Sequence, residues 1–155
     1  MIRETIPEDT EKLIQIAIEA EMFPAEASGF LEEMFSTHFA SGEHVCLTDL
    51  ENGEPCGMAY ARPVETTDGT WNLLMIVVAP GRQGSGRGRA LMESVETTLS
   101  KRGERLLLVE TSGLESYAKT RRFYAGSGYT ETARVPDYYA AGEDMVLFRK
   151  SLGQG

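Results

Sequence analysis

A glycine-rich segment that directly follows an apolar run constrains this chain more than any other feature. Residues Leu73–Val78 are all apolar, and Pro80–Leu91 then reads Pro-Gly-Arg-Gln-Gly-Ser-Gly-Arg-Gly-Arg-Ala-Leu. The pattern predicts a strand that enters a glycine turn, and a helix that begins at the end of this turn. Such an arrangement directs unpaired backbone N–H groups and the positive end of a helix dipole at one small volume. The sequence therefore predicts a binding site for phosphate or pyrophosphate.

Two familiar phosphate-binding motifs do not fit the spacing of these glycines. A P-loop requires Lys and then Ser or Thr after its second glycine, whereas Arg87 and Gly88 follow Gly86. The dinucleotide fingerprint G-x-G-x-x-G/A fails from either starting glycine, because Arg89 or Leu91 occupies its last position. The segment is therefore either a loop for another phosphate ligand or a glycine-rich surface turn.

Length and composition indicate one globular domain. The 155 residues are 41% hydrophobic and 25% charged, which are ordinary values for a soluble protein. No apolar stretch approaches the ~18 residues that span a bilayer, and the first residues do not resemble a signal peptide. We therefore expect a single domain over residues 1–155, located in the cytoplasm and without a membrane partner.

The few cysteines and histidines of the chain show no spacing typical of a metal site, so we expect no metal cofactor. Asn52-Gly53 predicts a two-residue hairpin turn between two strands. In that register Cys56 faces Asp49 and Cys46 faces Ala59, so the two cysteines lie on opposite faces of the sheet. We therefore expect no disulfide, as is usual in a reducing compartment.

Charge is distributed unevenly along the chain. The formal net charge is −9, but residues 1–80 carry −12 and residues 81–155 carry +3, with Arg82, Arg87 and Arg89 around the glycine segment. Such a basic side suits an anionic cofactor, and the acidic remainder suits either a cationic substrate or simply a soluble surface. The overall acidity disfavours nucleic-acid binding.

Hydrophobic periodicity and turn residues predict alternating strands and helices. Capping boxes at Thr5-x-x-Glu8 and Ser112-x-x-Glu115 mark two helix starts. The continuous apolar run in Thr70–Val78 predicts a strand that is buried on both faces. The expected elements are a strand at Ile2–Ile6, helices over Pro7–Ala20 and within Ala25–Ala40, strands at His44–Leu50, Cys56–Pro63 and Thr70–Val78, a helix that stops at Gly103, a strand at Leu106–Glu110, a helix from Leu114 to Ala125, and strands near Tyr129–Arg134 and Met145–Arg149.

This order predicts a single α/β (α+β) domain with a mixed sheet of about seven strands and about four flanking helices. Within it, Gln83, Gly86 and Gly88 fit the pattern Q-x-x-G-x-G, placed after a strand and before a helix. The motif resembles the acetyl-coenzyme A loop of the GNAT superfamily of N-acetyltransferases. The resemblance implies a GNAT-like fold, with acetyl-CoA as the acyl donor and no metal.

A second motif in the expected place strengthens the resemblance. Tyr124 is followed four residues later by Gly128 and Tyr129, as in a GNAT segment that lies one strand and one helix beyond the loop. The likeness covers about residues 73–130 well, whereas residues 1–65 agree only in the order of their elements. The two motifs therefore identify a family but no individual protein.

The resemblance also implies which residues bind the cofactor. The pantetheine arm would pair with the backbone of one strand end, and the backbone amides of the loop would hold the pyrophosphate. The implied cofactor residues are Ile76, Val77 and Val78 in the strand, and Gln83, Gly84, Ser85, Gly86, Arg87, Gly88 and Arg89 in the loop.

Acyl transfer to an amine requires a neutral amine and a proton for the leaving thiolate. Glu110, at the end of its strand, matches a glutamate that acts as the base in some family members. Its alternative role is a carboxylate ion-paired with Arg105 or Arg121. Tyr124 matches the general acid of the family, and its alternative role is an aromatic ring packed in the core.

The resemblance thus implies direct transfer of an acetyl group, through a tetrahedral intermediate, to a primary amine of a small molecule or peptide. Two alternatives remain at this stage: a non-catalytic module that binds acyl-CoA, and an unrelated phosphate-binding protein with a similar loop. The sequence does not identify the amine, and it leaves open whether the protein is a homodimer.

Overall fold

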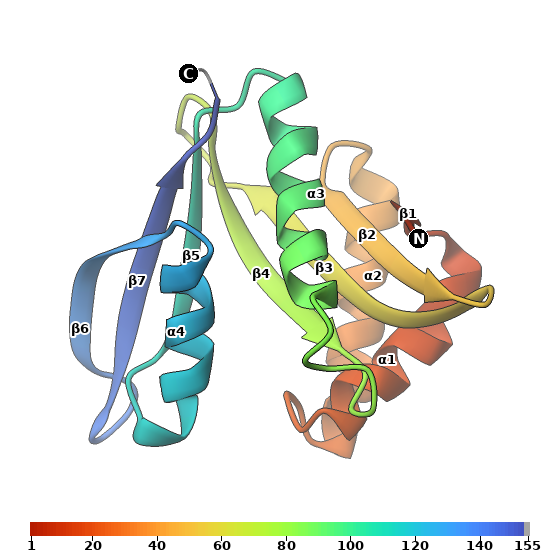
Figure 1. Cartoon of the computed structure of the whole chain (residues 1–155), viewed down its shortest axis with the longest axis horizontal. Helices are drawn as coiled ribbons and strands as arrows, with labels where there is room; N and C mark the ends of the chain where they lie inside the picture. Colours follow the sequence, from red (N-terminus) through yellow and green to blue (C-terminus); the bar gives the residue numbers. More distant parts are fainter. Residues whose placement is uncertain (154–155) are drawn as a thin grey trace. The chain divides into compact units, whose positions relative to one another are not determined.

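The computed structural model describes residues 1–153, and the element order expected from the sequence is confirmed (Figure 1). The strands are β1 (Ile2–Glu4), β2 (Val45–Glu51), β3 (Glu54–Pro63), β4 (Thr70–Val78), β5 (Leu106–Ser112), β6 (Thr130–Ala140) and β7 (Glu143–Ser151). The helices are α1 (Thr10–Glu19), α2 (Ser28–Ser41), α3 (Arg87–Lys101) and α4 (Ala118–Gly126), with short 3-10 turns at Pro7–Asp9, Ala25–Ala27 and Glu115–Tyr117.

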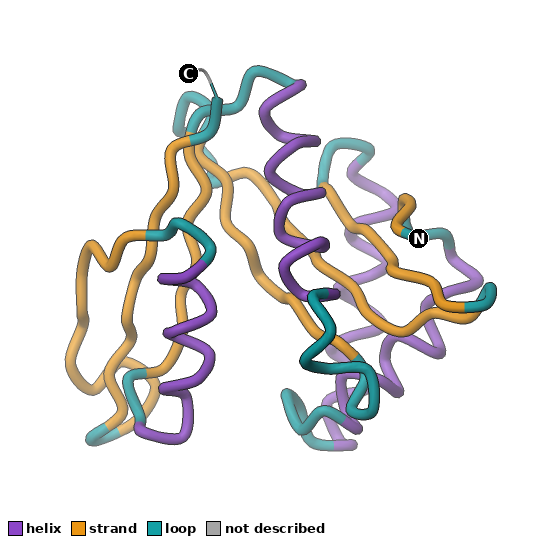
Figure 2. Tube along the Cα trace, viewed as in Figure 1, coloured by secondary structure: helices purple, strands orange, loops and turns teal. Residues whose placement is uncertain are grey.

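The strands form a mixed seven-stranded sheet in the order β1-β2-β3-β4-β5-β7-β6. Figure 2 distinguishes strands, helices and loops along the chain by colour. The pairs β1–β2, β2–β3, β5–β7 and β6–β7 are antiparallel, whereas β4 and β5 run parallel. A mixed sheet with flanking helices is the predicted α/β class. The contacts divide the chain into an N-terminal unit, Met1–Arg62 with Met75–Thr98, and a C-terminal unit, Pro63–Leu74 with Leu99–Gly155.

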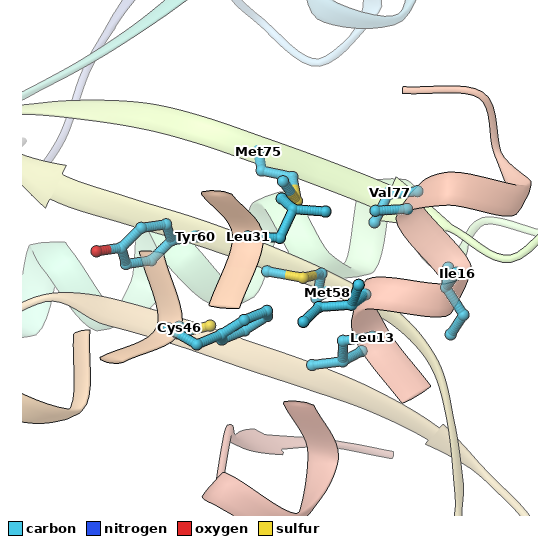
Figure 3. Packing of buried hydrophobic residues seen from close by; sticks show 11 residues of the cluster. Leu13, Ile16, Leu31, Cys46, Met58, Tyr60, Met75 and Val77 are labelled. Atoms are coloured by element: carbon cyan, nitrogen blue, oxygen red, sulfur yellow. The ribbon is translucent and has the colours of Figure 1, made fainter. Parts of the chain in front are cut away.

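The core of the N-terminal unit lies between its sheet and the helices α1 and α2. Leu13 and Ile16 of α1 and Leu31 of α2 pack against Met58 and Tyr60 of β3 (Figure 3). All five side chains are at most 1% exposed. Removing such large buried side chains typically costs about 2–5 kcal/mol of stability, so this core anchors the strands that precede the glycine loop.

Helix α3 packs on the opposite face of β3, at Gly57. An added Cβ at this glycine would lie 2.9 Å from the Val77 carbonyl oxygen and 3.4 Å from the Leu91 side chain. Only glycine therefore lets β3, the end of β4 and α3 approach this closely. The apolar face of α3 consists of four fully buried side chains, Leu91, Met92, Val95 and Leu99.

The C-terminal unit is built on the β5–β7–β6 ladder and on α4. Strand β7 pairs with the whole length of β5, from Leu106↔Ser151 to Ser112↔Met145. Tyr124 of α4 packs on Phe148 of β7, with ring centroids 5.7 Å apart. The α4 helix is therefore fixed to this part of the sheet by an aromatic contact.

Strand β4 corrects one sequence-based prediction. Its burial alternates along the strand instead of being complete on both faces. Trp71, Leu73, Met75 and Val77 are at most 5% exposed, whereas Leu74 is 37% exposed. An uninterrupted apolar run therefore marked this central strand correctly but overstated the burial of its second face.

The turn at Asn52-Gly53 is confirmed, but the register beyond it differs from the expected one. Asn52 and Gly53 both have positive φ, and Glu51 pairs with Glu54 as expected. A bulge then shifts the register by one residue between Asp49 and Leu50, so Cys46 faces Tyr60 instead of Ala59. Bulges insert one unpaired residue into a strand, and the turn sequence carries no signal for them. Both cysteines are buried and free.

Both predicted capping boxes are wrong, although helices follow them. The Thr5 hydroxyl hydrogen-bonds to the Thr48 hydroxyl at 2.7 Å, and Asp9 accepts the Ile6 N–H at 3.0 Å. Ser112 accepts only the N–H of Leu114, at 3.1 Å. The cross-strand contact to Thr48 is a tertiary interaction that a local capping pattern does not report.

A cluster of aromatic rings surrounds the two histidines, between α2 and the β2–β3 hairpin. The Nδ1 of His44 lies 2.7 Å from the Tyr60 hydroxyl. The ring of His38 stands edge-on to Tyr60, with centroids 5.7 Å apart. The Nδ1 of His38 is buried and has no hydrogen-bond partner within residues 1–153. Burial and the neighbouring His44 lower the pKa of His38, against the opposing effect of Glu4.

Replacing His38 by phenylalanine should therefore raise the melting temperature, and more at pH 5.5 than at pH 7.5. Because the pKa of His38 is lowered in the folded protein, the stability that neutral His38 contributes is fully present above the pKa of the unfolded chain, ~6.5. This stability is lost as the pH falls through the pKa of the folded protein. Phenylalanine keeps the ring and removes an unpartnered polar atom. Each 1 kcal/mol gained should raise the melting temperature by about 2–4 °C.

Thermal unfolding of both proteins at the two pH values measures this effect. Burial and Arg62 also lower the pKa of His44, against Glu43. His44 is present in both proteins, so its contribution to the pH dependence cancels in the comparison, apart from its repulsion of His38, which the substitution removes. An equal or lower melting temperature of the variant at pH 5.5 would contradict the role given to His38.

Candidate active site

The glycine-rich segment forms a loop between the end of β4 and the start of α3. Strand β4 ends at Val78 and α3 begins at Arg87. The first backbone bond of the helix runs from the Ala90 N–H to the Gly86 carbonyl, at 3.0 Å. The predicted order of strand, glycine turn and helix is therefore confirmed at these residues.

The loop is held by its own polar side chains. Gln83 Nε2 donates to the Val78 carbonyl at 3.0 Å, and Ser85 Oγ donates to the Arg82 carbonyl at 3.0 Å. The Arg82 N–H donates to the Ala79 carbonyl at 2.9 Å. These bonds close the loop on the end of β4 before any ligand is present.

Glycine is required at two loop positions for conformational reasons. Gly84 has φ +82° and Gly86 has φ +86°, a region in which other L residues are strained. An added Cβ at either position would meet no atom within 4 Å. The backbone therefore borders open space here, which leaves room for a ligand to approach the peptide groups.

The loop presents a run of unused backbone donors. Within residues 1–153, the N–H groups of Gly84, Ser85, Gly86, Arg87 and Gly88 donate no hydrogen bond to the protein. They surround the N-terminus of α3, where the helix dipole favours negative charge. These groups fit a phosphate or pyrophosphate, whose oxygens accept several hydrogen bonds at once.

Two of the three loop arginines are paired with carboxylates of β2. Arg87 donates to Asp49 at 2.8 Å and to Glu51 at 2.7 Å. Arg82 forms an ion pair with the same Glu51. Asp49 and Glu51 are functional neighbours of the loop that the sequence analysis did not identify. They lie more than 30 residues upstream, and no local pattern links them to the loop.

The strand residues expected to bind the cofactor lie directly before the loop. Ile76, Val77 and Val78 form the last residues of β4, in the N-terminal unit. The parallel ladder of β4 with β5, in the C-terminal unit, runs from Thr70↔Leu106 to Leu73↔Val109. The structure thus brings these strand residues next to the loop residues in one unit.

Tyr124, the expected general acid, lies in α4 of the C-terminal unit. It is 6% exposed and packs edge-on against Tyr129, with centroids 6.2 Å apart. Within the described residues its hydroxyl makes no hydrogen bond. Burial raises the pKa of Tyr124 to about 12, and the nearby Tyr139 adds to the shift. The phenol therefore keeps its proton at any working pH.

Glu110, the expected base, lies on β5 and is exposed. The ion pairs considered for it are absent from the described residues: Arg105 donates to the Asp68 carbonyl at 2.7 Å, and Arg121 donates to the Ser112 carbonyl at 2.7 Å. Its negative charge contributes, after burial, to the raised pKa of Tyr139, about 12. Glu110 and Tyr139 are therefore neighbours.

Residues 1–153 contain no group of three or more side chains suited to hold a metal ion. None of the helices among these residues is both long and apolar enough to cross a membrane. Among the described residues, the N-terminal unit offers the backbone donors of the loop, and the C-terminal unit holds Glu110 and Tyr124.

Comparison with known proteins identifies the family. Residues 11–129 match the model of the acetyltransferase (GNAT) family. A structure from Desulfovibrio desulfuricans that is assigned to this family is 32% identical, with a TM-score of 0.93 over 99% of both chains. The chain therefore belongs to the GNAT family of acetyltransferases, as the two sequence motifs predicted.

More distant solved structures share the fold, and their names give different acceptors. An aminoglycoside 6'-N-acetyltransferase solved with coenzyme A is 17% identical, with a TM-score of 0.82 over 100% of this chain and 98% of its own. The ribosomal-protein-S18-alanine N-acetyltransferase from Escherichia coli is 24% identical, with a TM-score of 0.79 over 100% and 95%. At these identities the likeness establishes the fold alone.

Proposed function

We propose that this protein is an acetyl-CoA-dependent N-acetyltransferase that acts on a primary amine of a small molecule or peptide. The observation that carries the proposal is the run of free N–H groups from Gly84 to Gly88 at the start of α3. Family membership and a relative solved with coenzyme A support it. We further propose that residues 1–155 act together as one domain, in the cytoplasm.

The cofactor residues follow from the loop and from the strand before it. The amides of Gly84 through Arg89 hold the pyrophosphate, and the Gln83 side chain keeps the loop closed on Val78. The backbone of Ile76–Val78 pairs with the pantetheine arm like an added strand. Acetyl-CoA supplies the acetyl group as a thioester.

Glu110 and Tyr124 move the protons of the reaction. Glu110 accepts a proton from the acceptor ammonium, which frees the nitrogen to form a bond to the acetyl carbonyl carbon. Tyr124 donates its phenolic proton to the sulfur as the carbon–sulfur bond breaks. The acceptor nitrogen loses its second proton, which restores the phenol, and the products are the amide and free coenzyme A.

Two measurements on the purified protein test the proposal. Acetyl-CoA at 100 times its dissociation constant should stabilise the fold by about 2.7 kcal/mol and raise the melting temperature. With a panel of amino acids, polyamines, aminoglycosides and peptide N-termini, at least one amine should cause release of free thiol. Acetyl-phosphate, which lacks the nucleotide, is the matched control ligand.

Each failure points to a different alternative. A melting temperature unchanged by acetyl-CoA would remove coenzyme A as the ligand and leave an unrelated phosphate site. Stabilisation by acetyl-CoA without thiol release from any amine would indicate a non-catalytic acyl-CoA-binding module instead of an enzyme.

A further inference from the structure

We propose that Asp49 of β2 is a positioning residue for the cofactor loop and that it acts through Arg87, while Glu51 fixes Arg82 and Arg87 together. In this arrangement Arg82 and Arg87 connect the loop to β2 through ion pairs, and the backbone amides bind the phosphate. The inference rests on the proposed function only in the identity of the ligand.

The contact between Asp49 and Arg87 is short and mostly buried. Arg87 Nη1 lies 2.8 Å from Asp49 Oδ2, and Arg87 Nη2 lies 2.7 Å from Glu51 Oε2. The side chain of Asp49 is 4% exposed and that of Arg87 is 22% exposed. Breaking a buried pair leaves an uncompensated charge, which is far more costly than losing a pair on the surface.

The position of Arg87 makes this contact relevant to the ligand. Arg87 is the first residue of α3, and its N–H belongs to the run of free donors. Because both terminal nitrogens of its guanidinium contact β2 carboxylates, the orientation of the first helical turn is tied to β2. Donors held in place before binding raise affinity, since less conformational entropy is lost with the ligand.

The second tie acts at the start of the loop. Arg82 pairs with Glu51, its N–H donates to the Ala79 carbonyl at 2.9 Å, and its carbonyl accepts the Ser85 hydroxyl at 3.0 Å. One carboxylate of the β2–β3 hairpin therefore contacts an arginine at each end of the loop. Arg82 and Arg87 lie on either side of Gly84 and Gly86, the two loop glycines with positive φ.

The same pairs limit the positive charge that the loop presents. The guanidinium groups of Arg82 and Arg87 each face a carboxylate, so Asp49 and Glu51 balance the charges of these two arginines. Attraction between exposed charges is weakened by salt over a Debye length of about 8 Å at 0.15 M. If backbone donors bind the phosphates, the affinity for acetyl-CoA should therefore depend less on salt concentration than it would if unpaired arginines bound them.

Asp49 has further contacts that a substitution would also change. Its Oδ1 lies 3.3 Å from the amino group of Met1, and its charge raises the pKa of Cys56 together with burial. The test therefore replaces Asp49 by asparagine, which keeps the shape of the side chain. The control is the same substitution in an ion pair elsewhere in the protein. Arg134–Asp144, at 3.3 Å in the C-terminal unit, provides that control.

The experiment measures the acetyl-CoA dissociation constant by calorimetry, and the kcat and KM for acetyl-CoA, in Asp49→Asn and Asp144→Asn. For Asp49→Asn we expect a dissociation constant and KM at least tenfold higher, with kcat at saturating cofactor within threefold of the native value. Asp144→Asn should change neither constant. Glu51→Gln, a milder change at a more exposed site, should raise the dissociation constant by a smaller factor.

A double-mutant comparison and an exchange measurement separate positioning from general damage. If Asp49 acts through Arg87, Asp49→Asn combined with Arg87→Gln should bind acetyl-CoA no more weakly than Arg87→Gln alone. In the ligand-free protein, the Ala90 amide, bonded to the Gly86 carbonyl, should exchange at least tenfold faster in Asp49→Asn than in Asp144→Asn.

An unchanged Ala90 exchange rate or an unchanged dissociation constant in Asp49→Asn would overturn the inference, as would additive losses in the double variant. Failure of the native protein to bind acetyl-CoA would refute the proposed function instead. In that case the exchange of Ala90 still decides whether Asp49 holds the loop.

Discussion

Replacement of Tyr124 by phenylalanine should lower kcat by about 100-fold or more, the usual contribution of a positioned general acid. The substitution removes only the hydroxyl, and the ring contact with Phe148, at 5.7 Å, is retained. The hydroxyl has no partner within the described residues, so its loss leaves no unsatisfied group behind. Stability should therefore change little while turnover falls.

The pKa of Tyr124, raised to about 12, sets the pH dependence of this step. The phenol is protonated throughout the range from pH 6 to 9, so its ionisation should produce no limb in the pH–rate profile there. A limb in that range would report a group other than Tyr124, such as the base or the acceptor amine.

Stopped assays of thiol release measure the kcat of Tyr124→Phe, and thermal shift with acetyl-CoA confirms that the variant still binds. Tyr117→Phe, a change to a 42% exposed tyrosine in the turn before α4, is the matched control and should retain native turnover. Native kcat in Tyr124→Phe with intact binding would show that the ring is a structural part of the C-terminal unit.

Replacement of Gly86 by alanine should weaken acetyl-CoA binding at least tenfold. Gly86 has φ +86°, and a residue with a Cβ costs roughly 1–2 kcal/mol in this region. The space around its Cβ position is open in the free protein, so the added methyl group would occupy the volume assigned to the pyrophosphate. The backbone strain lowers the stability of the fold, whereas the methyl group in the ligand volume lowers the affinity for acetyl-CoA.

Gly103→Ala is the matched control for this strain. Gly103 follows α3, has φ +81°, and has no atom within 4 Å of its Cβ position. Both variants should lose similar stability, as measured by chemical unfolding, but only Gly86→Ala should lose affinity in calorimetry. Equal affinities in the two variants would mean that the phosphate binds elsewhere.

The loop could be predicted from the sequence because its geometry depends on local properties. Positive φ at Gly84 and Gly86 requires glycine, and the strand and helix on either side have strong hydrophobic periodicity. The two GNAT motifs are also local sequence patterns, and the family match confirmed the family membership that they indicated.

The features that the sequence did not predict depend on contacts between distant residues. Arg87 and Asp49 are 38 positions apart, and their pairing follows from the packing of α3 on β3. The bulge beside Asp49 moved the hairpin register by one residue, and Thr5 bonded to Thr48 instead of capping a helix. Charge summed over each half of the chain also missed that Arg82 and Arg87 are paired with Asp49 and Glu51.

The central claim is that the backbone amides of the loop bind the phosphates of acetyl-CoA. An NMR titration of the ¹⁵N-labelled protein with acetyl-CoA and with dephospho-CoA tests it most directly. We expect large amide shifts at Gly84, Ser85, Gly86, Arg87 and Gly88 with both ligands, because both carry the pyrophosphate. Saturable binding without shifts at these amides would show that the loop does not bind the phosphates.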